Sequence, residues 1–298
     1  MRNIIDYSLR EWVTGVPVEH GFKRARNFAV ERAFRASRPT HYDRFMAGLT
    51  GPYPNIIITI AFNTPWVVDL ATRMARQNLH AQFIVCDNSR KPEARQEIER
   101  ICRERDVPYI GLPFNPERHP CRSHGVAMNW AYYNIVRPLQ PSVFGFFDHD
   151  LFVVEPLDVA TMVADQPVYG RLNASRWGWN LWAGFCIYRL SDVMNRAPDF
   201  NNDVPRHLDT GGRNWSQVYR HFNFDRLKFA KAGTAEIRFN DDPEQAEVEM
   251  VDTCLHVSGA SFGPHRTAKS GRAFFERVVR HIEGGGTLDD LRAPSSSS

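Results

Sequence analysis

Apolar and polar residues follow two alternating periods along the first half of the chain. Four short runs, residues 56–62, 81–86, 109–112 and 143–147, are rich in β-branched or aromatic residues and have the length of buried strands. The stretches between them, residues 65–76, 92–105 and 125–136, read as helices. Strands separated by helices are typical of βαβ units. We therefore predict an α/β fold with a mostly parallel central sheet that is covered on both faces.

The pattern is less regular in the second half of the chain. It predicts a helix at residues 157–164, a strand at 183–189, a helix that begins near Thr210 and a strand-like segment at 255–257. One more helix is indicated by an apolar stripe of five residues, Phe274, Phe275, Val278, Val279 and Ile282. We see no internal repeat, so these elements are assigned to the same domain as the strands before them.

Turn-forming residues divide the chain into three parts. Gly51-Pro52-Tyr53-Pro54 separates an N-terminal extension, residues 1–54, from a single α/β domain at residues 55–283. The run Gly284-Gly285-Gly286 ends the last predicted helix, and the chain closes on four serines. Residues 284–298 are therefore predicted to be a flexible C-terminal tail.

The N-terminal extension is basic and is predicted to be largely helical. Between positions 20 and 44 there are seven basic and two acidic residues, and apolar residues recur near helical spacing. Two interpretations remain open. The helix could pack on the main domain with a solvated basic face, or residues 20–44 could contact an anionic membrane surface or another anionic partner.

Composition and charge narrow the function. Apolar residues make up 43% of the 298 residues, and the formal net charge is only +3, which is too mild for a nucleic-acid-coating protein. Five widely spaced cysteines include no C-x-x-C pair, which argues against a disulfide framework and fits a reducing compartment. Neither a signal peptide nor an apolar run of membrane-spanning length is recognisable. We expect a cytoplasmic protein, either free or bound peripherally to a membrane.

The candidate chemistry lies where the fourth predicted strand ends. The apolar run at residues 143–147 leads directly into Asp148-His149-Asp150. In extended chain, residues i and i+2 point the same way, so Asp148 and Asp150 can present two carboxylates to one point. Such a pair at the tip of an apolar strand is costly to desolvate unless solvent, a partner or a cation compensates it. Hard oxygen ligands suit Mg²⁺ or Mn²⁺, so we interpret the triplet as a metal site; a turn or helix-capping role is the alternative.

At this point the chain resembles the GT-A fold glycosyltransferases that use nucleotide sugars, in particular the large inverting, family 2-like group. Four segments carry the resemblance over about residues 55–215: Thr59-Ile60-Ala61-Phe62-Asn63, Val85-Cys86-Asp87-Asn88-Ser89, Ser123-His124-Gly125 with Asn129, and the D-x-D triplet Asp148-His149-Asp150. In that family the first two segments hold the base and ribose of the donor, and the third leads into the metal-binding strand. The resemblance implies a single Rossmann-like GT-A domain with hexosyltransferase activity.

The resemblance also implies roles for individual residues. Asp150 would be the principal metal ligand, Asp148 would reach the metal or the ribose, and His256 would be a further ligand of Mn²⁺ or Mg²⁺. The nucleoside-diphosphate sugar would be bound by Ala61, Phe62, Asn63, Asp87, Ser123 and Asp148. A lone histidine is more often structural, which is the alternative for His256.

Inverting transfer needs a base for the acceptor hydroxyl, and Asp209 in His207-Leu208-Asp209-Thr210-Gly211-Gly212 is the candidate. The alternative is an N-cap aspartate of the helix predicted after it. Trp177, Trp179 and Trp182 could form a platform for a sugar, lipid or small-molecule acceptor, although core packing explains at least one of them. A Q-x-x-R-W sequence of processive polymerases is absent, so transfer of a single sugar is expected.

Two other functions stay open. A retaining glycosyltransferase of the same fold would share the D-x-D triplet but would use Asp209 only to position substrate. A non-catalytic sugar- or lipid-binding module on a decayed transferase domain would dock through the basic extension. A nucleotidyltransferase is disfavoured because residues 61–65 lack a phosphate loop rich in glycine and lysine.

Overall fold

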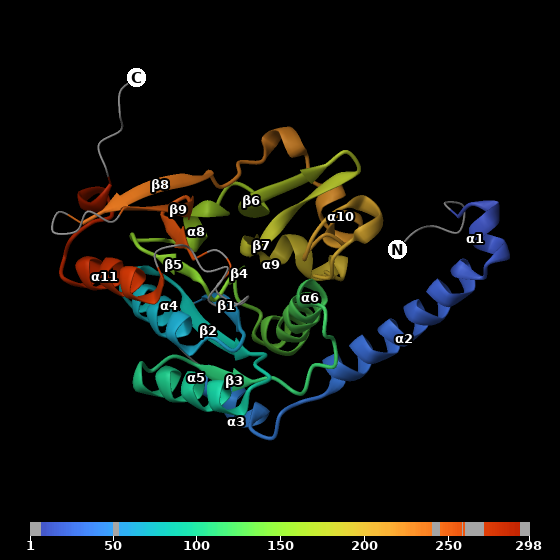
Figure 1. Ribbon diagram of the computed structural model, residues 1–298, viewed down its shortest axis with the longest axis horizontal. Helices are drawn as coiled ribbons and strands as arrows, with labels where there is room; N and C mark the ends of the chain where they lie inside the picture. Colours follow the sequence, from blue (N-terminus) through green and yellow to red (C-terminus); the bar gives the residue numbers. More distant parts are fainter. Residues whose placement is uncertain (1–6, 50–53, 240–244, 258, 260–270, 293–298) are drawn as a thin grey trace.

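Six strands form the central sheet of the protein, in the order β3-β2-β1-β4-β7-β6 (Figure 1). The computed structural model describes residues 7–49, 54–239, 245–257, 259 and 271–292. The first four strands in this order run parallel, and β7 and β6 are antiparallel to their neighbours. The strands are β1 (Asn55–Ala61), β2 (Gln82–Asp87), β3 (Tyr109–Gly111), β4 (Val143–Phe147), β6 (Val168–Ser175) and β7 (Gly178–Arg189). The predicted α/β fold with a mostly parallel sheet is confirmed.

A second, antiparallel sheet lies beside the first, in the order β5-β10-β9-β8. Its strands are β5 (Leu151–Val153), β8 (Ala232–Arg238), β9 (Gln245–Val251) and β10 (Cys254–His256). Only residues 148–150 separate β4, in the first sheet, from β5, in the second. The chain therefore passes from one sheet to the other at the D-x-D triplet.

Helices cover both faces of the central sheet. On one face lie α4 (Pro65–Asn78) and α5 (Pro92–Glu104), and on the other lies a continuous helical segment made of α6 (Pro120–Ala131), the π-helix η2 (Tyr132–Val136) and α7 (Arg137–Leu139). In α5 the buried residues Ala94, Ile98, Ile101 and Cys102 recur at helical spacing, which explains why this highly charged segment is a helix.

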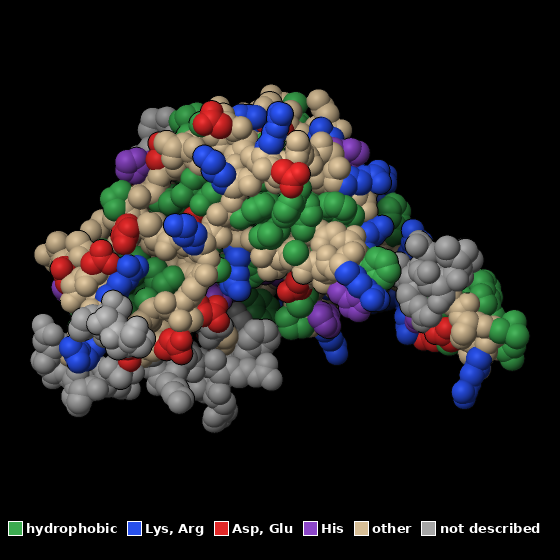
Figure 2. Space-filling view, turned by 90° about the horizontal axis from the view of Figure 1, so that it is seen from above, with side chains coloured by type: hydrophobic (Ala, Val, Ile, Leu, Met, Phe, Trp, Pro, Cys, Tyr) green, Lys and Arg blue, Asp and Glu red, His purple; other side chains and the backbone are tan. Residues whose placement is uncertain are grey.

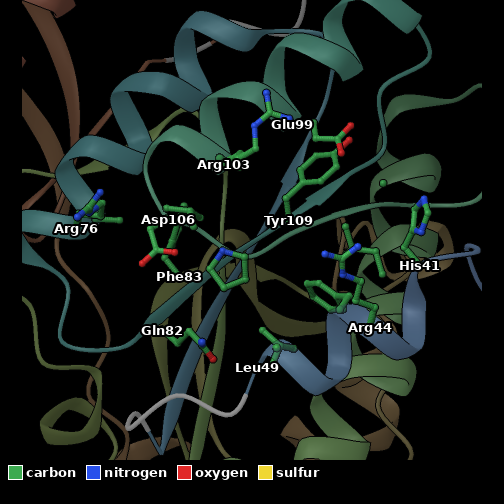
Figure 3. A pocket seen from close by; sticks show the side chains of 18 of the residues that line it. His41, Arg44, Leu49, Arg76, Gln82, Phe83, Glu99, Arg103, Asp106 and Tyr109 are labelled. Atoms are coloured by element: carbon green, nitrogen blue, oxygen red, sulfur yellow. The ribbon is translucent and has the colours of Figure 1, made fainter.

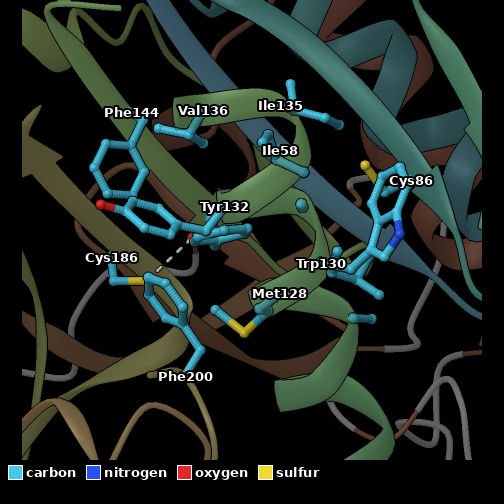
Figure 4. Close-up of a cluster of buried hydrophobic side chains, with 14 of the residues drawn as sticks. Ile58, Cys86, Met128, Trp130, Tyr132, Ile135, Val136, Phe144, Cys186 and Phe200 are labelled. Carbon is cyan, nitrogen blue, oxygen red and sulfur yellow. Dashed lines mark hydrogen bonds between the residues drawn. The ribbon is translucent and has the colours of Figure 1, made fainter. Parts of the chain in front are cut away.

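Alternation along β4 builds the core on both faces. Phe144 and Phe146 point to the side of α6. Phe144 packs against Tyr132 (Figure 4), and Phe146 packs against Phe200. Phe147 points to the opposite face and stacks on Phe185 of β7 with ring centroids 4.8 Å apart. Burying each such ring is worth about 1.5–3 kcal/mol. The strand that ends at the D-x-D triplet is thus fixed from both sides.

The second half of the chain differs from the sequence prediction in several places. The helix expected from Thr210 begins only at Asn214, because the intervening turn places Gly211 at a φ of +87°, in the left-handed region that glycine favours. Strands β5, β6, β8 and β9 were not predicted. In β8 most side chains are exposed, so it carries no apolar run that would mark a strand. The remaining short helices are α8 (Val159–Met162), α9 (Leu190–Val193), α10 (Asn214–Gln217), η3 (Met194–Arg196), η4 (Val204–Arg206), η5 (Tyr219–His221) and η6 (Phe224–Arg226).

The N-terminal extension is helical, as predicted, and most of it stands away from the body. It comprises α1 (Leu9–Val13), α2 (Val16–Ala36) and α3 (Tyr42–Gly48), and α2 projects outward from its last turn (Figure 1). Phe34, near the end of α2, and Tyr42 in α3 are buried in the core of the body. Within the described residues, none of the helices is both long and apolar enough to cross a membrane.

The last described residues are packed, which differs from the predicted tail. After α11 (Gly271–Glu283), the 3-10 helix η8 (Asp289–Leu291) returns to the second sheet, and Leu288 and Leu291 are buried among Ile237, Val248 and α11. Single leucines in a hydrophilic stretch do not predict packing from sequence, because only the structure shows that they are buried. Residues 293–298 of the predicted tail lie outside the described residues.

This packing gives a prediction about stability. Replacing Leu288 by Ala should lower the free energy of unfolding by about 2–5 kcal/mol, because the side chain is fully buried and its removal leaves a cavity. Urea denaturation followed by circular dichroism measures the change. Asp289→Ala is the matched control in the same turn, and equal stability of both variants would contradict the packing described here.

Candidate metal and nucleotide-sugar site

A cavity of about 420 Å³ opens where β1, β2 and β4 end. In parallel α/β sheets this carboxyl edge is where ligands bind. The first turns of α6, the middle of β7 and the end of β10 complete its wall. The residues that line the cavity include Phe62, Arg90, Arg118, Cys121, Ser123, His124, Asp148, Asp150, Trp182, Asp209 and His256.

The crossover between the two sheets positions the two aspartates. The backbone N–H of Asp148 donates to the carbonyl of Gly184 on β7, at 3.0 Å, so the end of β4 remains attached to the first sheet. The carbonyl of Asp150 accepts from the N–H of Val257, at 2.8 Å, which attaches the start of β5 to β10. A Cβ atom at position 184 would lie 2.6 Å from Asp148 Oδ2. Glycine at this position therefore leaves the room that the carboxylate occupies.

Pairing of β5 with β10 brings His256 to the aspartates. His256 lies opposite Leu151 in the register of these strands, and its Nε2 is 3.4 Å from Asp150 Oδ1. Its other ring nitrogen, Nδ1, donates to Glu249 Oε2 at 2.9 Å, which turns Nε2 toward the cavity. Ligating histidines commonly have such a carboxylate partner on the second nitrogen. One donor atom from each of Asp148, Asp150 and His256 lies within 4.8 Å of the others, so this set of two carboxylates and one imidazole could hold a divalent cation.

Asp148, Asp150 and His256 shift one another's pKa values. Burial raises the pKa of the Asp148 carboxyl group, an effect that His124 opposes and the neighbouring Asp150 strengthens. Burial acts in the same direction on Asp150, but the hydrogen bond from His256 and nearby histidine charges outweigh it and lower the pKa. Burial alone would lower the pKa of His256, whereas its hydrogen bond to Asp150 raises it to about 9. A proton on His256 thus offsets carboxylate charge at the point where a cation would do so.

Asp209 is exposed and lines the same cavity. Its carboxylate lies beside Cys121 on the first turn of α6, where burial and this charge together raise the pKa of the thiol to about 11. The N-cap of α10 is Arg213, four residues later, so Asp209 does not cap that helix. Helix capping, the alternative explanation for this aspartate, therefore does not apply.

The three tryptophans occupy different environments. Trp182 lines the cavity, with its ring 4.9 Å from that of His256 and the Arg171 guanidinium 5.1 Å from its centroid. Trp179 is only 6% exposed and stacks on Tyr219 in the core. Trp177 lies in the exposed turn between β6 and β7, outside the cavity lining. Of the predicted acceptor platform, only Trp182 reaches the cavity.

Only some of the residues predicted to bind the nucleotide sugar line the cavity. Phe62 and Ser123 line the cavity, together with Asp148. Ala61 and Asp87 are fully buried and do not reach it.

Asp87 instead belongs to a network on the α5 side of the sheet. Its Oδ2 accepts from the Tyr109 hydroxyl at 3.0 Å and lies 3.9 Å from Nε of Arg95. Asn63 braces a loop: its Oδ1 accepts from the backbone N–H groups of Arg90 and Lys91. Neither side chain therefore lines the cavity: Asp87 connects β2 to β3 and α5, and Asn63 connects the end of β1 to the loop after β2.

Several residues of the site were not predicted from sequence. No role was predicted for His124, which lies in the segment Ser123-His124-Gly125. Its Nε2 lies 3.7 Å from Asp148 Oδ1. Glu249 belongs to β9, a strand that sequence reasoning missed. Arg90 and Arg118 bring positive charge to the cavity wall. Arginines are frequent in this sequence, so composition gives no signal that would distinguish these two.

A larger cavity of about 1220 Å³ lies near the β3 edge of the central sheet, among α3, α5 and the start of β2 (Figure 3). Its wall combines Arg44, Arg103, Glu99 and Asp106 with apolar residues such as Phe83. Its lining does not include Asp148, Asp150 or His256. We therefore assign the chemistry to the smaller cavity.

Comparisons with known proteins give no match to a family profile and none to a curated sequence. Among solved structures, the chain is similar to a mannosyltransferase from Pyrobaculum calidifontis in complex with GDP-Man and Mn²⁺, at 12% identity over 59% of this chain and a TM-score of 0.36. It is also similar to glucosyl-3-phosphoglycerate synthase from Mycobacterium tuberculosis in complex with Mn²⁺, UDP and glucosyl-3-phosphoglycerate, at 13% identity over 53% of this chain and a TM-score of 0.34. The matches cover 56% and 64% of those two chains, less than two-thirds of either.

Proposed function

We propose that this protein is a metal-dependent glycosyltransferase that moves a single hexose from a nucleoside-diphosphate sugar to an acceptor hydroxyl, with inversion at the anomeric carbon. The observation that carries the proposal is the convergence of Asp148, Asp150 and His256 on one point of a cavity at the carboxyl edge of the sheet. A buried carboxylate, Asp150, beside the partly buried Asp148 is costly without a cation, so a binding role explains their position.

Asp148, Asp150 and His256 Nε2 would hold Mn²⁺ or Mg²⁺, for which the two carboxylates supply hard oxygen ligands. When bound, a divalent cation supplies positive charge that stabilises a diphosphate leaving group. The protein adds positive groups of its own: Arg90 and Arg118 line the cavity, and the N-terminal turn of α6 lies against it. The amino end of a helix and arginine side chains both favour phosphate oxygens.

The donor and acceptor would enter from different walls. Phe62 and Ser123, near the ends of β1 and β2, are placed to contact the nucleoside, and Trp182 offers an aromatic face to a sugar or lipid acceptor. Among the described residues that line the cavity, Asp209 is the one carboxylate outside the metal cluster, and we assign it as the base that removes the acceptor proton. That assignment supports inversion, because a retaining transferase would not need this base.

We also propose a reducing, cytoplasmic location. All five cysteines of the chain are free, and four of them are buried. Burial raises the pKa values of Cys102 and Cys186 to about 12, so their thiols stay protonated and unreactive at neutral pH.

The activity test separates metal binding from proton removal. Asp150→Ala should abolish Mn²⁺-dependent stabilisation by UDP or GDP in a thermal-shift assay, because ligand binding to the folded state raises the melting temperature. Asp209→Asn is the matched control in the same cavity: it should keep the Mn²⁺-dependent shift but reduce turnover by about 100-fold or more. Full transferase activity in Asp209→Asn would dismiss the base, and nucleotide stabilisation that survives Asp150→Ala would dismiss the metal site.

Stereochemistry gives an independent test. Once a donor sugar is found by nucleotide-sugar screening with Mn²⁺, the anomeric configuration of the new glycosidic bond can be read by NMR. An inverting mechanism predicts the configuration opposite to that of the donor. Retention would leave the metal site intact but would reduce Asp209 to a positioning residue.

A further inference from the structure

The two N-terminal helices form an arm, defined here as α1 and α2, residues 9–36. Figure 2 shows the arm standing away from the body, with hydrophobic, basic and acidic side chains close together toward its far end. In α1, Leu9, Trp12 and Val13 are 82%, 45% and 81% exposed, and their i, i+3 and i+4 spacing places them on one side of the helix. Exposed side chains of this kind in one segment indicate a contact surface rather than a core.

The apolar side of α2 faces away from the protein. Successive residues of a helix are rotated by about 100°. On this spacing Asn27, Val30, Glu31 and Phe34 lie on the side that meets the body, and they are buried or half-buried. The opposite side, an arc of about 120°, is fully exposed. We call it the outer face; it consists of Val18, Phe22, Ala25, Phe28, Ala29, Arg32 and Ala36.

Positive charge borders the outer face. Arg24 and Arg26 flank it on either side, and Arg32 lies within it. At the base of the arm, Arg32, Arg35 and Arg38 line a hollow of about 570 Å³ together with Tyr133. The Arg35 guanidinium stacks over the Tyr133 ring at 4.3 Å, which holds this basic wall in place. The only acidic residue in the second half of α2, Glu31, points toward Arg122 and Arg213 of the body, each at 4.0 Å.

We propose that the arm docks the protein on the surface of an anionic phospholipid membrane. Aromatic and aliphatic side chains of the outer face and α1 would enter the interface, and the arginines would contact lipid phosphates. Charge decides between this partner and a second copy of the chain. The charged residues nearest the outer face of α2, Arg24, Arg26, Arg32 and Arg35, are all arginines, so pairing two arms by these faces would place like charges together. An anionic surface meets the same arginines with opposite charge.

The proposed membrane-contact surface differs in its boundaries from the range predicted from sequence, residues 20–44. Phe34 and Tyr42, which fall in that range, are buried in the body and cannot face a membrane. The docking surface begins earlier, with Leu9, and ends near Ala36. This inference does not depend on the proposed transferase activity, because it can be tested without a donor sugar.

The test is sedimentation of the full chain with vesicles, of phosphatidylcholine alone or of phosphatidylcholine mixed with phosphatidylglycerol. The wild type should bind the mixed vesicles, should bind less as salt is raised and should not bind phosphatidylcholine alone. The double variant Phe22→Ser/Phe28→Ser and the triple variant Arg24→Glu/Arg26→Glu/Arg32→Glu should each lower binding by about tenfold or more. Phe114→Ser, which changes an 80% exposed aromatic on the body, is the matched control and should bind like the wild type.

Unchanged melting temperatures would show that the variants fold, as expected for exposed positions. Light scattering after size-exclusion chromatography completes the experiment. A wild-type dimer that Phe22→Ser/Phe28→Ser converts to a monomer, without vesicle binding by either, would overturn the proposal in favour of a second copy. Binding that is equal for both vesicle types, or equal for all variants, would also overturn it.

Discussion

The site depends on one constraint: two carboxylates are held side by side where the chain leaves one sheet and enters another. β4 is anchored in the first sheet by its apolar side chains and by the bond from Asp148 to Gly184. β5 is anchored in the second sheet by β10, which also delivers His256. Neither sheet alone assembles the cluster. The two neighbouring carboxylates raise the pKa of His256, and the protonated imidazole offsets part of their negative charge. A divalent cation at the same point would offset this charge in the same way.

The surrounding architecture follows from this junction. Parallel strands β1, β2 and β4 bring their ends to one edge, so Phe62 and the aspartates share a cavity although they are far apart in sequence. The antiparallel β7 passes behind them and contributes Trp182. The turn after residue 208 brings Asp209 to the same cavity. The proposed metal, donor and acceptor roles fall on different elements, so they can be tested separately by substitution.

Sequence reasoning could find the junction because its signal is local. An apolar strand interrupted by two acids is unusual, and the β-α alternation before it fixes the edge of the sheet. It could not sort the tryptophans, because β7 was expected to begin at residue 183 rather than at Gly178. Along the actual strand, Trp179 and Trp182 lie on opposite faces, one in the core and one at the cavity. The same alternation separates Asp87 from Asn88: only Asn88 lines the cavity. Glu249 and the packing of Leu291 depend on long-range contacts that no local pattern reveals.

The central claim is that Asp148, Asp150 and His256 together bind a divalent cation. The most direct measurement is anomalous diffraction at the manganese absorption edge, from crystals grown with Mn²⁺ and a nucleoside diphosphate. We predict one strong peak coordinated by these three side chains and by phosphate oxygens. A map without a peak at this position, with both carboxylates turned into protein contacts, would contradict the account.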